Sequence, residues 1–179
     1  MKKQQWLILA AGAGVAAVAY NLLSKDIPKN ATAVQPFDKN RYMGTWNEIA
    51  RLPNKIEKNI NQLTEEYSLN PDGTIKVVTG GYNYKKNKWN ELEGKIKFIK
   101  NEDLGMLKVS YLGPFYASYN VLDIDPDYKY ALVSGSGLDY LWILSKETTI
   151  PNNIKKQFIA KAKDIGFAIE KLEWPDVAA

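Results

Sequence analysis

The 179-residue sequence contains no cysteine and no histidine. Without cysteine the chain cannot form disulfides, thiolate metal sites or a thiol nucleophile, and it offers no cysteine for lipid attachment. Without histidine it lacks Ser-His and Cys-His catalytic pairs, imidazole-ligated zinc and a histidine-ligated haem. These absences exclude most common hydrolase designs, and the sequence predicts no metal site and no cofactor.

A basic stripe of the kind that binds nucleic acid is also missing. The net charge is only +4, and the lysines are scattered along the chain. Stretches such as Lys95 to Phe98 alternate charged and apolar residues, as a solvated strand face does. Hydrophobic residues make up 45% and aromatic residues 12%, which is enough for the core of one domain with an appendage.

An uncharged run from residue 4 to 24 follows Lys2 and Lys3. It fits a secretory signal with a small-residue cleavage site near Ala19, and it also fits an uncleaved helical anchor over residues 6–23. The anchor is slightly favoured, because the apolar run continues beyond Ala19. Both interpretations predict export to the periplasm or cell envelope. The expected organisation is a signal or anchor over residues 1–24, a polar linker over 25–36 and a folded domain over 37–176.

The folded domain has the pattern of an all-β protein. Eight short strand-like segments follow one another, separated by turn-forming residues, and this spacing favours an up-and-down antiparallel β-barrel. The segments span residues 44–52, 63–69, 75–79, 89–99, 107–111, 115–122, 130–133 and 140–144.

The spacing of the apolar residues changes after the eighth segment. Residues 151–165 carry an apolar stripe at helical spacing, with Thr149 as a candidate cap and Gly166 as the end. We expect this helix to pack outside the barrel. Residues 167–174 then predict one further strand.

Gly44 and Trp46 lie in the first strand, two residues apart. A glycine there allows a sharp backbone turn, and a tryptophan on the same face can plug one end of a barrel. The indole N–H of such a buried tryptophan needs a hydrogen-bond partner.

The segment Asn40 to Arg51 resembles the first signature of the lipocalin family. Gly113 to Leu122 and Asp139 to Lys146 resemble the bacterial outer-membrane branch of that family, which is related to apolipoprotein D. The resemblance runs from about Phe37 to Trp174. It implies that Lys146 packs over the ring of Trp46, a cation–π contact worth roughly 0.5–2 kcal/mol.

The sequence departs from the family pattern in three respects. Asn47 stands where a tyrosine is usual, and the middle signature is only approximated by residues 125–130. The bacterial relatives are often lipoproteins anchored through an N-terminal cysteine, which this chain lacks, so the apolar segment at the N-terminus is expected to replace that anchor.

The resemblance implies a barrel that holds a fatty acid, a lysophospholipid or another lipid, with no catalytic role. Strand alternation and the resemblance give candidate wall positions, of which Tyr116 and Trp142 are favoured by the resemblance because each joins an apolar ring to a hydrogen-bond donor. The other predicted wall residues are Val77, Thr79, Leu92, Ile96, Phe98, Val109 and Tyr111.

Two other functions remain open at this point. A lipocalin-fold enzyme acting on a lipid would need a cavity carboxylate such as Glu48, for which a structural partner is the preferred explanation. A membrane-tethered interaction module with a collapsed barrel is the third. Asp123, Asp125 and Asp127 resemble the start of a calcium loop, but Tyr128 occupies the glycine position, which favours a plain turn. The expected partners are a lipid ligand, a membrane if the N-terminal helix is uncleaved, a possible second copy of the chain, and no nucleic acid.

Overall fold

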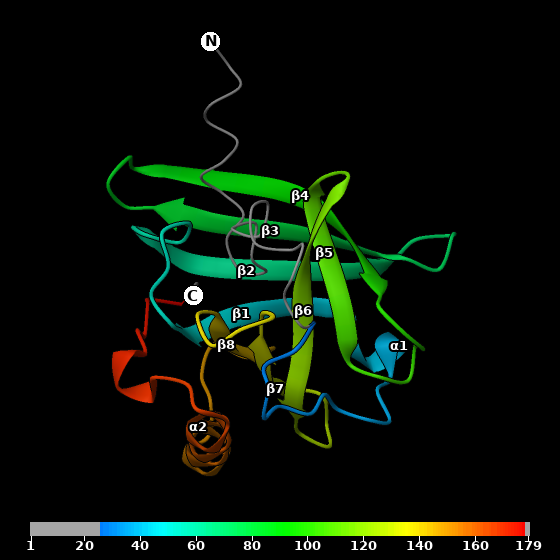
Figure 1. Ribbon diagram of the computed structural model, residues 1–179. Helices are drawn as coiled ribbons and strands as arrows, with labels where there is room; N and C mark the ends of the chain where they lie inside the picture. Colours follow the sequence, from blue (N-terminus) through cyan, green and yellow to red (C-terminus); the bar gives the residue numbers. More distant parts are fainter. Residues whose placement is uncertain (1–25, 178–179) are drawn as a thin grey trace.

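The computed structural model describes residues 26–177 as a closed barrel of eight antiparallel strands with one longer helix outside it (Figure 1). Each strand pairs with its neighbour in sequence, and β1 pairs with β8 to close the sheet. The predicted up-and-down barrel is confirmed. The strands are β1 (Gly44–Arg51), β2 (Ile60–Leu69), β3 (Ile75–Asn83), β4 (Lys88–Phe98), β5 (Met106–Leu112), β6 (Phe115–Ile124), β7 (Tyr130–Ser134) and β8 (Leu141–Ser145).

Strands β2 and β3 are longer than their sequence patterns predict. Strand β3 continues through Gly80 and Gly81, where a side chain would clash. A Cβ on Gly80 would lie 2.7 Å from the ring of Trp89, and one on Gly81 would lie 2.6 Å from Ile60. The two glycines therefore let neighbouring strands and side chains approach closely, and they do not end the strand.

The long helix, α2 (Asn152–Ile165), packs on the outside of the barrel as predicted. Its buried residues Phe158, Ala162 and Ile165 join an apolar cluster on the outer faces of β1, β6, β7 and β8. Gly166 ends the helix with φ +110°, donating its N–H to the carbonyls of Ala162 and Lys163. The expected cap at Thr149 is wrong, because Pro151 holds the cap position and no side chain caps the helix.

The predicted strand over residues 167–174 is also wrong. A single turn of 3₁₀ helix, η3 (Ile169–Lys171), occupies this region, followed by one bridge between Arg51 and Glu173. Strand β2 pairs with β1 only from Gly44 to Asn47, so the end of β1 keeps a short free edge, and Glu173 alone pairs there with Arg51.

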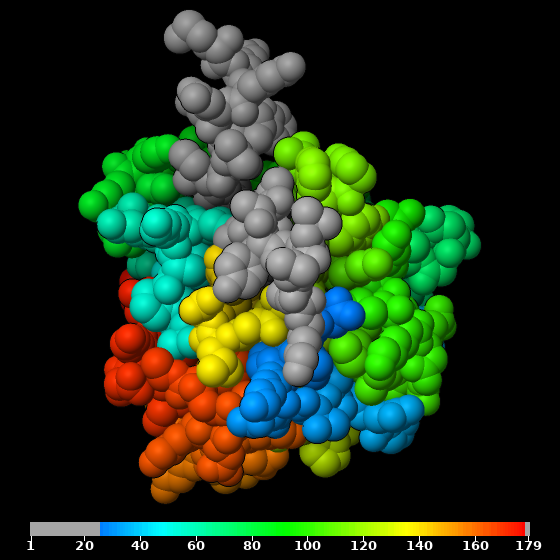
Figure 2. All heavy atoms as spheres, in the orientation of Figure 1, coloured from blue at the N-terminus to red at the C-terminus, as the bar shows by residue number. Residues whose placement is uncertain are grey.

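The polar segment before the barrel lies against it from the first described residues onward. Val34 donates its N–H to the Val121 carbonyl at 2.9 Å and accepts one from Gly105 at 2.9 Å. In the space-filling view this blue segment lies between the orange helix α2 and the green strands (Figure 2). The part of the expected polar linker from residue 26 to residue 36 is thus hydrogen-bonded to the barrel. Among residues 26–177 no helix has the length and apolarity needed to cross a membrane, and the predicted apolar helix and cleavage site lie outside the described residues.

Candidate functional site

The closed end of the barrel is sealed by aromatic side chains. Trp46 is fully buried, and its indole N–H donates to the Tyr42 carbonyl at 2.9 Å. Tyr42, at the end of α1 (Lys39–Tyr42), stacks on that indole with ring centroids 4.9 Å apart. Gly44 joins α1 to β1 with φ +104°, a conformation that favours glycine.

Lys146 covers this end from the last strand, as the family resemblance implies. Its Nζ lies 5.1 Å from the centre of the Trp46 ring and donates to the carbonyls of Arg41 and Met43, each at 2.8 Å. Burial and the nearby Arg41 charge lower the pKa of Lys146 from its ordinary value. The lysine therefore ties α1, β1 and the end of β8 together.

The inner face of the barrel is largely apolar. Most of the predicted wall positions face inward, and many of them belong to one contiguous buried cluster. Thr79 and Leu92 stand opposite each other on the inner faces of β3 and β4. The inward-facing wall positions are Val77, Thr79, Leu92, Ile96, Phe98, Val109, Tyr111 and Trp142.

The predicted inward position of Tyr116 is wrong. Side chains alternate along β6, and its neighbours Ala117, Tyr119 and Val121 belong to the inner cluster. The Tyr116 ring consequently lies on the outer surface, where the Nζ of Lys97 is 4.5 Å from its centre. It cannot line the interior from this face.

Trp142 faces inward, yet its donor is already engaged. The indole N–H donates to Glu57 Oε1 at 3.0 Å, and the ring stacks on Tyr140 with centroids 5.7 Å apart. Trp142 therefore offers an apolar surface to the interior, while its polar edge fixes the loop between β1 and β2.

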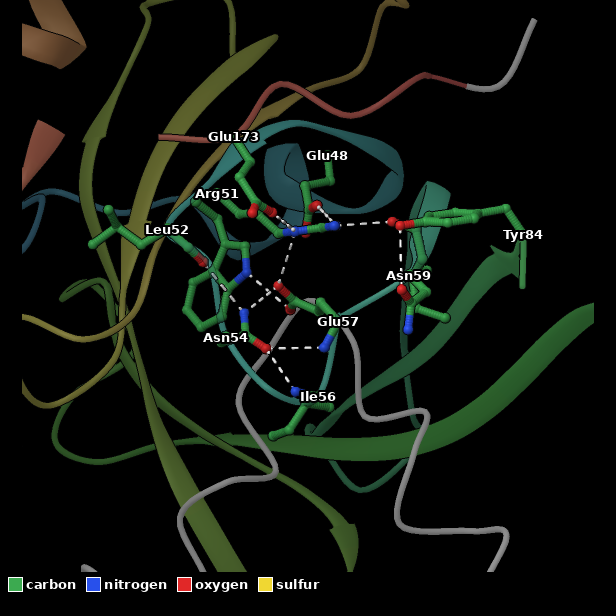
Figure 3. Close-up of polar contacts among 11 residues, drawn as sticks. Glu48, Arg51, Leu52, Asn54, Ile56, Glu57, Asn59, Tyr84 and Glu173 are labelled. Carbon is green, nitrogen blue, oxygen red and sulfur yellow. Dashed lines mark hydrogen bonds and ion pairs between the residues drawn. The ribbon is translucent and has the colours of Figure 1, made fainter. Parts of the chain in front are cut away.

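A cluster of charged residues lies at the open end, where β1 leads into that loop (Figure 3). Arg51 donates to Glu48 Oε1 at 2.6 Å and to the Ile60 carbonyl at 2.9 Å. Its Nε lies 3.7 Å from a Glu57 oxygen and 3.4 Å from a Glu173 oxygen. One buried guanidinium thus holds carboxylates from β1, the loop and the C-terminal segment.

Burial is the main cause of the altered pKa of Glu48. It raises that pKa well above the ordinary value, the Glu57 charge adds to the effect, and Arg51 opposes both. The structural partner expected for Glu48 is therefore confirmed as Arg51. Asn54 shapes the loop by accepting the N–H groups of Ile56 and Glu57 at 3.0 and 2.9 Å.

A surface pocket of about 560 Å³ lies beside this charged cluster. Its walls come from the β1–β2 loop, the β3–β4 turn and the C-terminal segment. Arg51, Lys55, Lys58, Tyr84 and Trp174 are among its lining residues.

The sequence pattern did not reveal a buried polar network near the closed end of the barrel, where Tyr42 stacks on Trp46. Tyr42, Tyr67 and Tyr119 bring their hydroxyls together, with 2.5 Å between Tyr42 and Tyr119 and 2.9 Å between Tyr67 and Tyr119. Tyr67 also donates to Glu65. Burial raises the pKa of Glu65 to about 8. A glutamate alternating with Leu63 and Tyr67 was the available signal, since a half-buried strand seldom places a charge on its apolar face.

Residues 26–177 contain no group of three or more acidic residues arranged to hold a metal ion. Asp125 instead organises a turn, accepting the N–H groups of Asp127, Lys129 and Tyr130 at 3.0, 2.6 and 2.6 Å. The expected plain turn is confirmed.

Comparison with known proteins matches residues 37–177 to the lipocalin-like domain family. The chain is 46% identical over 147 residues to the outer membrane lipoprotein Blc of Citrobacter freundii, covering 82% of this chain and 83% of that protein. It is 42% identical over 168 residues to the Blc of Escherichia coli strain K12, covering 94% of each. The structure of insecticyanin from Manduca sexta matches with a TM-score of 0.71 at 18% identity, covering 87% of this chain and 88% of that one. This last likeness concerns the fold alone.

Proposed function

The chain belongs to the lipocalin family, and from this membership we propose that its barrel binds a lipid, such as a fatty acid or a lysophospholipid, for transport or storage in the cell envelope. The observation that carries the proposal is the apolar inner surface, sealed at one end by Trp46 and Lys146. Each methylene group moved from water into such surroundings contributes about 0.8 kcal/mol. A long acyl chain therefore supplies ample binding energy without any charged contact.

The proposed role is non-catalytic. Glu48, the cavity carboxylate considered for catalysis, is bound through Oε1 to Arg51 at 2.6 Å, which favours a structural role. A lipid-converting enzyme would have to lose its turnover in the Glu48→Gln variant. We expect no turnover of a fatty acid or lysophospholipid by the unmodified protein.

The proposed location is the cell envelope, since the relatives named above are outer membrane lipoproteins. The chain has no cysteine to carry a lipid anchor. We propose instead that residues 6–23 hold the protein at the membrane, or that cleavage near Ala19 releases it, ahead of the linker over 25–36 and the barrel domain over 37–176. The intact mass of the exported protein distinguishes the two outcomes, and analytical ultracentrifugation in parallel reports whether it forms the possible homodimer.

Tryptophan quenching tests lipid binding directly. A brominated fatty acid quenches an indole that it contacts, so titration of the full-length protein should give saturable quenching at one ligand per chain. Trp142→Phe should remove a large part of that quenching. The matched control Trp89→Phe changes a tryptophan on the outer face that is 41% exposed. This variant should show the same ligand-induced quenching as the wild type. Absence of saturable quenching contradicts the proposal.

A further inference from the structure

Glu65 is a carboxyl group placed on the inner face of the barrel. In the strand register it stands opposite Trp46 on β1 and Thr79 on β3, and its exposed fraction is 0%. Its immediate neighbour Glu66 points outward and is exposed. Of two adjacent glutamates, the strand therefore turns one into the otherwise apolar interior and the other toward water.

The tyrosine network uses only one oxygen of this carboxyl. Tyr67 donates to Glu65 Oε2, so its oxygen is left to accept from Tyr119, and Tyr119 in turn is left to accept from Tyr42. In this order every tyrosine proton has an acceptor. Bracing the closed end of the barrel thus needs a single acceptor atom at position 65.

The other oxygen, Oε1, has no hydrogen-bond partner among the described residues. A buried polar atom without a partner is costly, and such atoms in folded proteins are usually met by water or a ligand. The second oxygen is therefore a hydrogen-bonding atom on the inner face that a group from outside residues 26–177 would satisfy.

Polar side chains continue from Glu65 around the inner wall. Thr79 on β3 is hydrogen-bonded to the Tyr111 hydroxyl of β5 at 2.6 Å. Between them Gly94 on β4 leaves space for the tyrosine ring, since a Cβ there would lie 2.7 Å from the ring. The ring consequently lies along the wall, and β2, β3 and β5 together present a polar band on the inner face.

We propose that Glu65 is a ligand-contacting specificity residue whose Oε1 hydrogen-bonds an oxygen function, a hydroxyl or a carboxyl, on the end of the lipid that enters the barrel first. This inference rests on the proposed lipid-binding function. The oxygen has two possible sources: a hydroxyl on the far end of an acyl chain, or the lipid's own carboxyl entering ahead of its chain. A neutral carboxyl at position 65 both donates and accepts, so it suits either group.

Three probes with the same chain length test the proposal on the full-length protein. Palmitic acid, ω-hydroxypalmitic acid and palmitoyl lysophosphatidylcholine share an acyl chain, but the bulky head of the last keeps any oxygen away from the closed end. Dissociation constants are measured for the wild type, Glu65→Leu, Glu65→Gln and the control Glu66→Leu.

In Glu65→Leu we expect binding of ω-hydroxypalmitic acid to weaken about tenfold relative to lysophosphatidylcholine, about 1.4 kcal/mol. Binding of palmitic acid weakens by the same factor if lipids enter the barrel carboxyl first. It is unchanged if the hydroxyl end of ω-hydroxypalmitic acid is the end that enters first. Glu65→Gln keeps a donor and an acceptor, so it should stay close to the wild type. Glu66→Leu should change none of the constants, and Glu65→Met gives the same comparison should the leucine variant not fold.

Two results overturn the inference and are distinguishable. Equal changes for all three probes in Glu65→Leu would make Glu65 a purely structural residue, while lipid binding stands. Failure of the wild type to bind any probe would remove the proposed function, and this inference with it.

Discussion

Replacing Glu65 by glutamine should remove a large pH dependence from the stability of this barrel. The unfolded chain presents this carboxyl with the ordinary pKa of 4.5, whereas burial in the folded barrel raises the pKa to about 8. The folded state therefore favours the protonated form. The stability that this preference gives is fully present below about pH 4.5 and is lost as the pH rises through about 8.

The size of the effect follows from these two pKa values. One pKa unit corresponds to about 1.4 kcal/mol, so the free energy of unfolding should fall by roughly 4 kcal/mol between about pH 5 and about pH 9 because of this group alone. Glutamine occupies a similar volume, accepts the Tyr67 hydroxyl and does not titrate. The glutamine also removes a negative charge that raises the pKa of Glu48. The pKa of Glu48 then rises less, which further reduces the pH dependence of the stability.

Urea denaturation of the full-length protein, followed by tryptophan fluorescence at several pH values, measures the difference. The wild type should lose stability toward alkaline pH more steeply than Glu65→Gln, and the two curves should diverge steadily above about pH 5. The control Glu66→Gln removes the same charge from the outer face and should follow the wild type. Parallel curves for the wild type and Glu65→Gln would refute the reasoning, because they would mean that Glu65 ionises in the folded protein as it does in water.

Three further substitutions test other parts of the barrel. Trp142→Ala should keep the fold but weaken fatty-acid binding at least several-fold, since an apolar wall of the interior is lost; unchanged affinity in a fluorescence competition assay would remove this residue from the site. Gly94→Ala places a Cβ 2.7 Å from a tyrosine ring on β5 and should cost about 1–3 kcal/mol by urea denaturation, whereas Gly137→Ala, with no atom within 4 Å, should be nearly neutral. Lys146→Met removes the contact with Trp46 and two hydrogen bonds to backbone carbonyls, so unfolding should become easier by roughly 1–3 kcal/mol. A melting temperature equal to that of the wild type would contradict this last expectation.

Features set by local sequence were predictable. Strand alternation, the turn residues and the glycine–tryptophan pair of β1 led to the closed barrel, and the family resemblance led to the contact of Lys146 with Trp46. Each depends on short-range geometry, or on a motif whose residues stand at fixed spacing. The helix α2 was likewise evident from its apolar stripe and from Gly166.

Features that depend on several distant segments were not predictable. The carboxylates around Arg51 come from β1, the following loop and the C-terminal segment, and no spacing in the sequence links them. Tyr116 lies an odd number of positions from the inner β6 residues Ala117, Tyr119 and Val121, and closure of the sheet decides which of the two sets faces inward. The end of β1 offers the C-terminal residues only a short free edge, which a local β pattern cannot reveal.

The proposed function and the role of Glu65 both depend on a lipid carried in the barrel. Native mass spectrometry of the full-length protein isolated from the cell envelope, with a lipid extract of the same sample, tests it most directly. We expect one lipid molecule per chain, with lower occupancy in Trp142→Ala. A spectrum that contains only the unliganded chain, both as isolated and after incubation with excess fatty acid, would contradict this expectation.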